Sequence, residues 1–240
     1  MKMGNGSLLK KCKGVIPAIL VKDKKEFQRV FSRVARVADC IQVDIMDGKF
    51  VKERSVRFSE LPNLSRHKKY FEAHLMVANP SRYFGVARQK GFFKVLFHIE
   101  SFPNAQRAER AIERAHASDL LAFIALNPGT HVRAVRNLLG EVDGILVMGV
   151  HPGKTGQKFI LSVKRKIEKL AEIREKYKMS FAIQVDGGVN LELAPQLRRL
   201  GVDYINSGSF VSESETPRKA FQQLARAFSS SKPKARVKNV

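Results

Sequence analysis

The fold is decided by the stretch Phe181-Ala182-Ile183-Gln184-Val185-Asp186-Gly187-Gly188, in which an apolar run ends in a carboxylate followed by two glycines. Upstream, Ile41-Gln42-Val43-Asp44-Ile45-Met46-Asp47-Gly48 repeats the design, with an acid and then a turn after a short apolar run. This pattern puts each acid at the C-terminal end of a strand, where barrel and open-sheet α/β enzymes have their active sites. Since paired carboxylates across a pocket suit removal and return of a proton at a carbon centre, Asp44 and Asp186 are the predicted catalytic residues.

Short β-type runs alternate with longer amphipathic stretches along the chain. Strands are predicted at residues 15–20, 41–46, 70–76, 94–98, 121–126, 144–150, 181–186 and 204–206. Helices are predicted at 24–38, 81–90, 104–116, 132–139, 160–178, 191–200 and 217–227, while 49–67 gives the weakest helical pattern. Strands alternating with helices imply parallel β-α-β units, and this number of units predicts an α/β fold, a (β/α)8 TIM barrel, with a doubly wound sheet as the alternative.

The chain of 240 residues fits one large α/β domain, and its 44% hydrophobic content is enough to fill a sizeable core. The catalytic barrel is predicted to occupy residues 14–228, after a short N-terminal extension at 1–13. The tail at 229–240 is polar and basic and is expected to be disordered. No run of 18 apolar residues occurs, so no membrane-spanning helix is predicted.

Cysteine usage bears on the cellular setting. Cys12 and Cys40 are the only cysteines in the sequence, and their spacing is not that of a metal site. The N-terminal residues lack an apolar stretch of signal-peptide length. We therefore expect reduced thiols in a cytoplasmic protein.

The net charge of +22 at pH 7 favours partners that carry phosphate, such as nucleic acids, membrane surfaces and small metabolites. A generally basic, soluble surface explains the charge equally well. No basic motif interleaved with aromatic residues stands out, so the charge alone does not predict a nucleic-acid partner. A small phosphorylated ligand is the favoured partner, and no membrane partner is expected.

Three glycine-rich turns late in the chain indicate where such a phosphate would bind. They are Gly153-Lys154-Thr155-Gly156, Gly187-Gly188 and Gly208-Ser209, each directly after a predicted strand. Glycines let backbone N–H groups approach an anion closely, and barrels often bind phosphate in the loops after the last two strands. A single turn of this kind is weak evidence, but three in one sector favour a phosphate site, to which Lys154 and Ser209 could add side-chain contacts.

A histidine and three methionines are predicted to lie at the C-terminal ends of strands, as the two acids are. His74 lies in the strand at 70–76, and together with Asp44 and Asp186 it forms a plausible ligand set for a divalent ion such as Zn, Mn or Fe. Met46, Met76 and Met148 also lie at strand ends, where methionine is usually a core residue but can wall a small site. Asp47 sits in the turn itself and fits a capping role better.

These residues occur within a series of motifs that resembles a known family. The motifs are Pro17-Ala18-Ile19-Leu20, Val43-Asp44-Ile45-Met46-Asp47-Gly48-Lys49-Phe50-Val51, His74-Leu75-Met76, Leu126-Asn127-Pro128-Gly129-Thr130, Val147-Met148, Pro152-Gly153, Gly156-Gln157-Lys158-Phe159 and Val185-Asp186-Gly187-Gly188-Val189. In order and spacing the chain resembles ribulose-phosphate 3-epimerase, a (β/α)8 barrel of the pentose phosphate and Calvin pathways. The resemblance runs from about Val15 to Val211.

The resemblance implies a function and a role for each matched residue. Asp44 and Asp186 would lie on opposite faces of D-ribulose 5-phosphate and invert C3 through an ene-diolate, giving D-xylulose 5-phosphate. In the family a divalent metal held by two histidines and these two aspartates stabilises the intermediate. The matched methionines line the family's substrate site, and the matched phosphate-binding turns are Gly187, Gly188, Gly208 and Ser209.

The chain departs from the family at several positions around the site. Gln42 stands where the family usually has a metal-binding histidine, which leaves Asp44, His74 and Asp186 as ligands and shifts the preference from Zn toward Mg or Mn. Alternatively, Gln42 donates a hydrogen bond to the ene-diolate and no metal is used. Val21 replaces a family serine, and His151 replaces the usual asparagine or aspartate. Lys154 is a cation that typical members lack.

Other functions stay open at this level. The chain could epimerise another ketose phosphate, or it could be a non-catalytic barrel that binds phosphate or nucleic acid. A lyase or decarboxylase is disfavoured because Asp44 is followed by Ile45-Met46, without the Asp-x-Lys arrangement of related barrels. Family members are often dimers or larger, so a homo-oligomer is possible.

Overall fold

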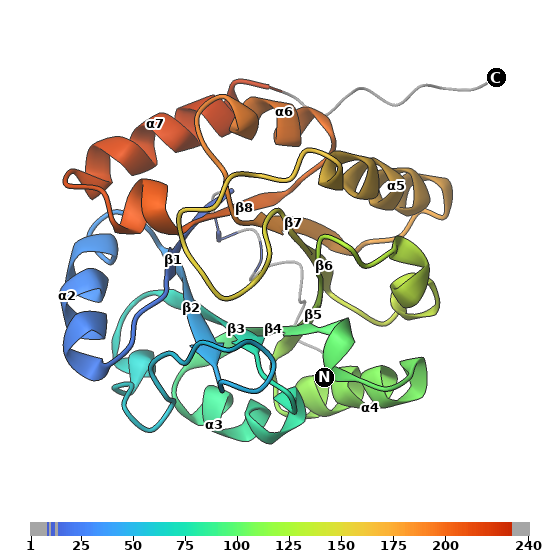
Figure 1. Cartoon of the computed structure of the whole chain (residues 1–240), viewed down its shortest axis with the longest axis horizontal. Helices are drawn as coiled ribbons and strands as arrows, with labels where there is room; N and C mark the ends of the chain where they lie inside the picture. The colour runs from blue at the N-terminus through green and yellow to red at the C-terminus, as the bar shows by residue number, and fades with distance from the viewer. Residues whose placement is uncertain (1–8, 10, 13, 232–240) are drawn as a thin grey trace.

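The computed structural model describes residue 9, residues 11–12 and residues 14–231 of the chain. Eight parallel strands close into a barrel in sequence order, with helices arranged around it (Figure 1). This closed barrel confirms the predicted (β/α)8 fold and excludes the doubly wound sheet. Of the tail predicted at 229–240, residues 229–231 are described and Ser229 ends helix α7, while 232–240 lie outside the described residues. Most of the predicted N-terminal extension also lies outside them.

The strands agree with the predicted runs to within two residues at every end. They are β1 (Val15–Ile19), β2 (Cys40–Met46), β3 (Tyr70–Met76), β4 (Phe92–His98), β5 (Leu121–Leu126), β6 (Gly144–Met148), β7 (Ala182–Asp186) and β8 (Tyr204–Ser207). The register pairs Asp44 of β2 with His74 of β3. On the other side of the barrel, Met148 of β6 pairs with Asp186 of β7. The carboxyl ends of the strands therefore bring the predicted site residues to one level.

The α-helices lie close to the predicted positions. They are α2 (Lys24–Val34), α3 (Phe84–Gln89), α4 (Ala105–Ala117), α5 (Val163–Lys176), α6 (Leu193–Arg199) and α7 (Pro217–Ser229). The short helical turns are η1 (Leu64–Arg66), η2 (Pro80–Arg82), η3 (Ile99–Ser101), η4 (Val132–Leu138) and η5 (Gly208–Ser212). Asp23 illustrates how a helix starts, because its side chain accepts a hydrogen bond from the backbone N–H of Glu26 and so caps α2.

Two predicted helices differ from the structure. Residues 132–139 were expected to be α-helical but form the 3₁₀ turn η4. Its buried residues Val132, Val135 and Leu138 recur every three positions, which matches the three residues per turn of a 3₁₀ helix. The weakly helical segment 49–67 contains only η1, and its first part instead folds back on β2, where Ser55 donates its backbone N–H to the carbonyl of Met46.

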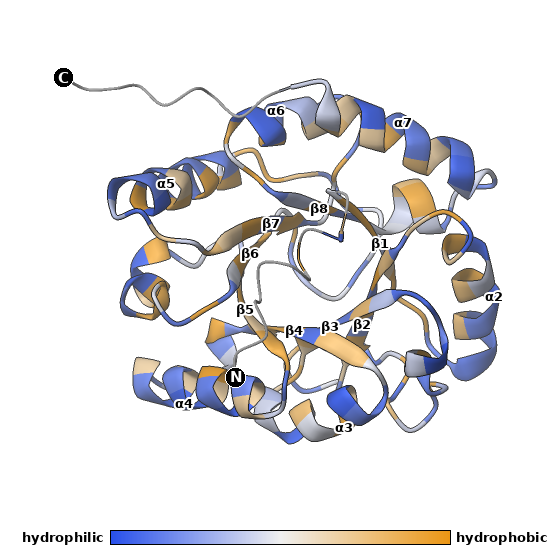
Figure 2. Ribbon diagram, turned by 180° about the vertical axis from the view of Figure 1, so that it is seen from behind, coloured by the Kyte–Doolittle hydropathy of each residue, from blue (hydrophilic) through white to orange (hydrophobic). Residues whose placement is uncertain are grey.

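The main hydrophobic core lies between the strands and the helices. Figure 2 shows hydrophobic residues along the strands and hydrophilic ones on the outer sides of the helices. Large side chains such as Phe27, Phe71 and Phe97 are completely buried in this layer. Each helix therefore buries one apolar stripe against the barrel, which holds the strands in the register that positions the site.

The expectation of reduced thiols is wrong in this structure. Cys12 and Cys40 form a disulfide with a Cα–Cα distance of 5.4 Å, and both residues are buried. The cysteines are 28 residues apart in sequence, but Cys40 is the first residue of β2 and Cys12 packs beside it and Ile16. Sequence spacing could not reveal this proximity because it arises from the parallel pairing of β1 with β2. Within the described residues, no helix is long and apolar enough to cross a membrane.

Candidate active site

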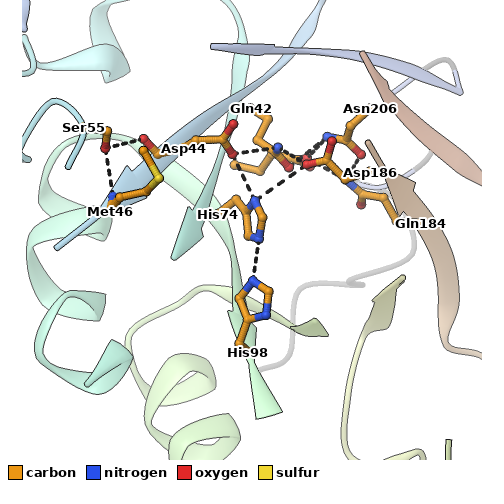
Figure 3. Close-up of polar contacts among 10 residues, drawn as sticks. Gln42, Asp44, Met46, Ser55, His74, His98, Gln184, Asp186 and Asn206 are labelled. Carbon is orange, nitrogen blue, oxygen red and sulfur yellow. Dashed lines mark hydrogen bonds and ion pairs between the residues drawn. The ribbon is translucent and has the colours of Figure 1, made fainter. Parts of the chain in front are cut away.

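Asp44, His74 and Asp186 meet at the carboxyl end of the barrel (Figure 3). The Nδ1 atom of His74 lies 3.0 Å from Oδ1 of Asp44 and 3.6 Å from Oδ2 of Asp186. All three side chains are buried, with at most 8% of each residue exposed. The two acids come from β2 and β7, which are not neighbours in the barrel, so only the closed sheet brings them together.

Gln42 lies directly beneath the two acids and joins them. Its Nε2 atom donates hydrogen bonds to Oδ1 of Asp44 at 2.9 Å and to Oδ2 of Asp186 at 2.6 Å. Its Oε1 atom accepts a hydrogen bond from Nδ2 of Asn206 at 2.8 Å. The side chain at the position of the family's histidine is therefore a donor toward the site.

The electrostatics of the site raise the pKa of Asp186. Burial and the neighbouring charge of Asp44 raise the pKa of Asp186 to about 6, against the opposing effects of His74 and Gln42. A carboxyl group with such a pKa can both hold and release a proton near neutral pH, which is what a general acid or base requires.

A second histidine stands behind the first. The Nε2 atoms of His74 and His98 lie 2.9 Å apart, and Nδ1 of His98 is 3.4 Å from Oε2 of Glu100. Burial lowers the pKa of His98 to about 4, so this imidazole is neutral. Burial alone would also lower the pKa of His74, but the hydrogen bond and charge of Asp44 and the charge of Asp186 outweigh it and raise that pKa.

The three convergent residues fit a divalent metal ion. His74 and the two aspartates each offer one ligand atom, and these atoms lie within 4.8 Å of one another. Imidazole and carboxylate ligands suit Zn, Fe or Mn. His98 also suits such a site, since a metal-bound histidine usually has a partner for its other ring nitrogen. Gln42 adds no fourth ligand in this arrangement, because it turns an N–H group toward the carboxylates and its oxygen toward Asn206.

A pocket at the barrel mouth collects almost all of the predicted site residues. Those that line it are Asp44, His74, Met76, Met148, Gly153, Lys154, Gly156, Asp186, Gly187, Gly188, Gly208 and Ser209. Met46 is the exception, because it lines a neighbouring cavity between β2 and the start of α3. His151, one of the departures from the family, also lines the mouth.

The turn after β7 requires glycine. Gly187 and Gly188 have φ angles of +99° and +69°, a region that L side chains rarely adopt. A Cβ atom at Gly188 would lie 2.5 Å from the backbone nitrogen of Phe159. The sequence Asp186-Gly187-Gly188 therefore lets the loop after β6 close against the end of β7, over the predicted phosphate end of the pocket.

Two other predicted residues have clear partners. Lys154 is largely exposed, and its ammonium lies 3.5 Å from Oε1 of Glu53 across the mouth. Asp47 accepts backbone hydrogen bonds from Lys49, Phe50 and Ala78. Burial opposes these bonds, but they lower the pKa of Asp47. No helix begins at this turn, so the expected helix-capping role is wrong, and Asp47 instead holds the loop after β2 in place.

Sequence reasoning missed several polar residues at or below the site. They are Glu72, Lys94, His98, Gln184 and Asn206, all buried. The signal that could have found three of them is the two-residue period of a strand. Glu72 precedes His74 by two positions, Gln184 precedes Asp186 by two, and Lys94 precedes His98 by four, so each points to the same face as its successor.

Comparison with known proteins matches most of the chain to one family. The model of the ribulose-phosphate 3 epimerase family matches residues 14–212. Ribulose-phosphate 3-epimerase of Mycobacterium tuberculosis is 32% identical over 215 residues, covering 88% of this chain and 91% of that protein. The enzyme of the same name from Bacillus subtilis is 34% identical over 197 residues, covering 78% of this chain and 86% of that protein.

Solved structures of other proteins share the fold. 3-Hexulose-6-phosphate synthase from Salmonella typhimurium aligns with a TM-score of 0.67 at 14% identity, covering 90% of this chain and 99% of that one. Orotidine 5'-phosphate decarboxylase from Pyrococcus horikoshii aligns with a TM-score of 0.59 at 14% identity, with coverage of 90% and 99%. These likenesses show the barrel alone, whereas the sequence matches extend over most of the chain. The chain therefore belongs to the ribulose-phosphate 3-epimerase family of enzymes.

Proposed function

We propose that this protein interconverts D-ribulose 5-phosphate and D-xylulose 5-phosphate, with Asp44 and Asp186 transferring the proton at C3. The observation that carries the proposal is the meeting of two buried carboxylates at one histidine, at the end of a pocket that also holds the glycine-rich turns. Family membership supports the epimerase activity.

The reaction needs one carboxylate and one carboxylic acid. The carboxylate removes the proton from C3 of the ketose, and the C–H electron pair moves into the bond to the carbonyl carbon to give an ene-diolate. The carboxylic acid then delivers its proton to the opposite face of C3, which inverts that centre. After turnover the proton has moved from one aspartate to the other, so the same pair serves the reverse reaction. The raised pKa of Asp186 suits it to this exchange near neutral pH.

The ene-diolate carries negative charge that must be stabilised within a buried site. His74 provides an N–H group there, hydrogen-bonded to Asp44. Both N–H bonds of Gln42 are directed at the two carboxylates. A divalent metal held by Asp44, His74 and Asp186 would supply a Lewis acid beside the developing charge. The barrel mouth places the backbone of Gly187, Gly188, Gly208 and Ser209 around the remaining part of the pocket, where we propose that the substrate phosphate binds.

Another ketose phosphate is the second candidate substrate. His151 lines the mouth where the family usually has asparagine or aspartate, so the pocket differs at a position that could contact a longer sugar. The cytoplasmic setting and a homo-oligomeric state stay predictions from the sequence.

The test is turnover of D-ribulose 5-phosphate by the purified protein, measured before and after exhaustive chelation and after adding back Mn, Fe, Zn or Mg. We expect turnover with the untreated or reconstituted protein. Loss of activity with chelator and recovery with one ion would establish a metal-dependent enzyme, and indifference to chelator would assign charge stabilisation to protein groups.

The control is the Asp44→Asn/Asp186→Asn double variant, which keeps the shape of both side chains. Near-native turnover by this variant would contradict the proposed chemistry. No turnover by the wild type with any ion, together with turnover of a hexulose 6-phosphate, would favour the second candidate substrate.

A further inference from the structure

Beneath the layer of Asp44, His74 and Asp186 lies a second layer of buried polar side chains. Its members, at most 1% exposed, are Gln42, Glu72, Lys94, Gln184 and Asn206. The interior layers of such barrels are usually filled by branched apolar side chains. Because burying a charge is costly unless it is paired, a complete ion pair inside the barrel calls for a physical explanation.

The five residues form one continuous chain of hydrogen bonds that starts at an ion pair. Lys94 contacts Oε2 of Glu72 through its ammonium and also donates to Oε1 of Gln184 at 2.9 Å. Gln184 donates through Nε2 to Oε1 of Glu72 at 2.6 Å and to Oδ1 of Asn206 at 2.7 Å. Asn206 donates through Nδ2 to the same Glu72 oxygen at 2.9 Å and to Oε1 of Gln42 at 2.8 Å. Part of this chain is visible in Figure 3.

The charge of Glu72 fixes the direction of every amide in this chain. A carboxylate only accepts hydrogen bonds, so Asn206 and Gln184 must turn their NH2 groups toward it. With its nitrogen committed in this way, Asn206 can only donate to Gln42, which must offer its oxygen. The NH2 group of Gln42 is then left facing Asp44 and Asp186. Reversing any one amide would set oxygen against oxygen or nitrogen against nitrogen.

We propose that the Lys94–Glu72 pair is a positioning device that locks Gln42 as a hydrogen-bond donor bridging Asp44 and Asp186, an inference that rests on the proposed function of those two residues. Glu72, Asn206 and Gln42 are therefore positioning residues for the proton transfer. A donor locked in this direction cannot ligate a metal, so among residues 14–231 the protein ligands of an ion at the site come from Asp44, His74 and Asp186.

The central test is the double variant Glu72→Gln/Lys94→Met, which removes both charges and keeps the volume of both side chains. A glutamine at position 72 can accept or donate, so the direction of the amides is no longer fixed. We expect kcat to fall about 10- to 100-fold, as is usual when the partners of site residues are changed. KM should change less than kcat because the phosphate end is untouched, and the midpoint of unfolding should stay the same or rise, because replacing a buried pair by neutral groups is often stabilising.

A purely structural role of the pair predicts a different outcome. In that case kcat would be unchanged in every preparation that is folded, and an unchanged kcat would overturn the proposal. Leu146→Met is the matched control, because Leu146 is also buried inside the barrel and pairs in register with Gln184. Its apolar side chain takes no part in the hydrogen bonds that link Lys94 to Gln42. We expect this variant to keep the kcat of the wild type.

The variant Gln42→Met tests the same proposal if the double variant does not fold. It removes the NH2 group that bridges the two acids and leaves the Lys94–Glu72 pair intact, so the proposal predicts a loss of kcat of similar size. Wild-type kcat in this variant would overturn the proposal.

A readout that does not depend on turnover separates this inference from the proposed function. In a ¹⁵N-labelled protein, the side-chain amide of Gln42 is identified by its absence from the spectrum of Gln42→Met. The proposal predicts slow hydrogen exchange for this amide in the wild type and faster exchange in Glu72→Gln/Lys94→Met. A wild type that is inactive on D-ribulose 5-phosphate but has a protected Gln42 amide would contradict the proposed substrate and support the locked orientation of Gln42. An active wild type whose Gln42 amide exchanges freely would contradict the locked orientation and leave the proposed epimerase activity intact.

Discussion

The two halves of the barrel interior differ sharply in chemistry. Toward β5 and β6 the interior is apolar, and Phe123 and Leu146 pack there with Leu96 of β4. Toward β2, β3, β7 and β8 it is polar, and Lys94 of β4 extends into this half to pair with Glu72 and Gln184. Both halves are equally buried, so exposure to water does not explain the contrast.

This contrast indicates that the polar half orients hydrogen-bond donors toward the site in addition to stabilising the barrel. Apolar side chains stabilise the barrel through the area they remove from water, without a preferred polarity. A hydrogen-bond chain that starts at Glu72 has a polarity, and it ends at the two carboxylates of the site. Variants that change one half of the interior, or the layer outside the barrel, distinguish effects on activity from effects on stability.

The largest effect is expected from the acids themselves. Asp44→Asn and Asp186→Asn should each lower kcat by about 10³-fold or more, because each removes the acid/base group on one face of the substrate. Both variants should fold, since an amide oxygen can still accept the hydrogen bond from Gln42. Steady-state turnover of D-ribulose 5-phosphate is the measurement, and a loss smaller than tenfold in either variant would contradict the two-acid mechanism.

The layer outside the barrel should respond in the opposite way. Phe71 is completely buried between β3 and the helices and contacts the rings of Phe31 and Phe92. Phe71→Ala should lower the free energy of unfolding by about 3–5 kcal/mol through the cavity it leaves. Denaturant unfolding measures this loss, and the kcat of the molecules that remain folded should match the wild type. A fall in kcat with full folding would show that this layer also tunes the site.

The disulfide beneath the barrel should have an intermediate effect on stability. Closing the 28-residue separation between Cys12 and Cys40 should stabilise the fold by roughly 3 kcal/mol through the entropy of the unfolded chain. Unfolding in the presence and absence of a reductant measures this difference, with the Cys12→Ser/Cys40→Ser variant as the control that should not respond. Titration of two free thiols in the native, untreated protein would contradict the disulfide.

Much of this architecture could be predicted from the sequence because it depends on local patterns. Each strand is an apolar run that ends at a turn, and the run before Asp186 was located to within one residue. The acid pair and His74 followed from their places at strand ends. The helix ends were less certain, since α2 stops at Val34 while its amphipathic pattern continues to Ala38.

The remaining features depend on contacts between distant segments. The direction of Gln42 is set by Asn206, which is 164 residues away in sequence, and no local pattern reports that contact. Predicting the disulfide would need the position of Cys12 relative to β2, which only the folded structure gives. Predicting that Met46 lines a second cavity would need the conformation of the loop after β2. Sequence patterns therefore identified which residues lie at the site, but not how their polar groups are oriented.

The smallest effect concerns the pH dependence of stability. The pKa of Asp186 is raised to about 6, so the folded state holds a proton that the unfolded state releases near the ordinary aspartate pKa of 3.8. The stability from this group is fully present below about pH 4 and is lost as the pH rises through 6. Asp186→Asn should therefore be more stable than the wild type by about 3 kcal/mol at pH 7.5, and by much less at pH 4.

Denaturant unfolding of the chelator-treated proteins at the two pH values measures this difference. Asp47→Asn is the matched comparison, because backbone hydrogen bonds lower the pKa of Asp47 and its contribution to stability is lost as the pH falls. If the difference in the free energy of unfolding between Asp186→Asn and the wild type were the same at both pH values, this would contradict the raised pKa of Asp186.

The most direct test of the central claim is the reaction of D-ribulose 5-phosphate in D2O, followed by NMR with the reconstituted protein. The two-acid mechanism predicts that D-xylulose 5-phosphate forms with deuterium at C3, because the proton delivered to the product comes from an aspartate that exchanges with solvent. Product that keeps the original C3 proton, or no product and no exchange at C3 with any ion, would contradict it.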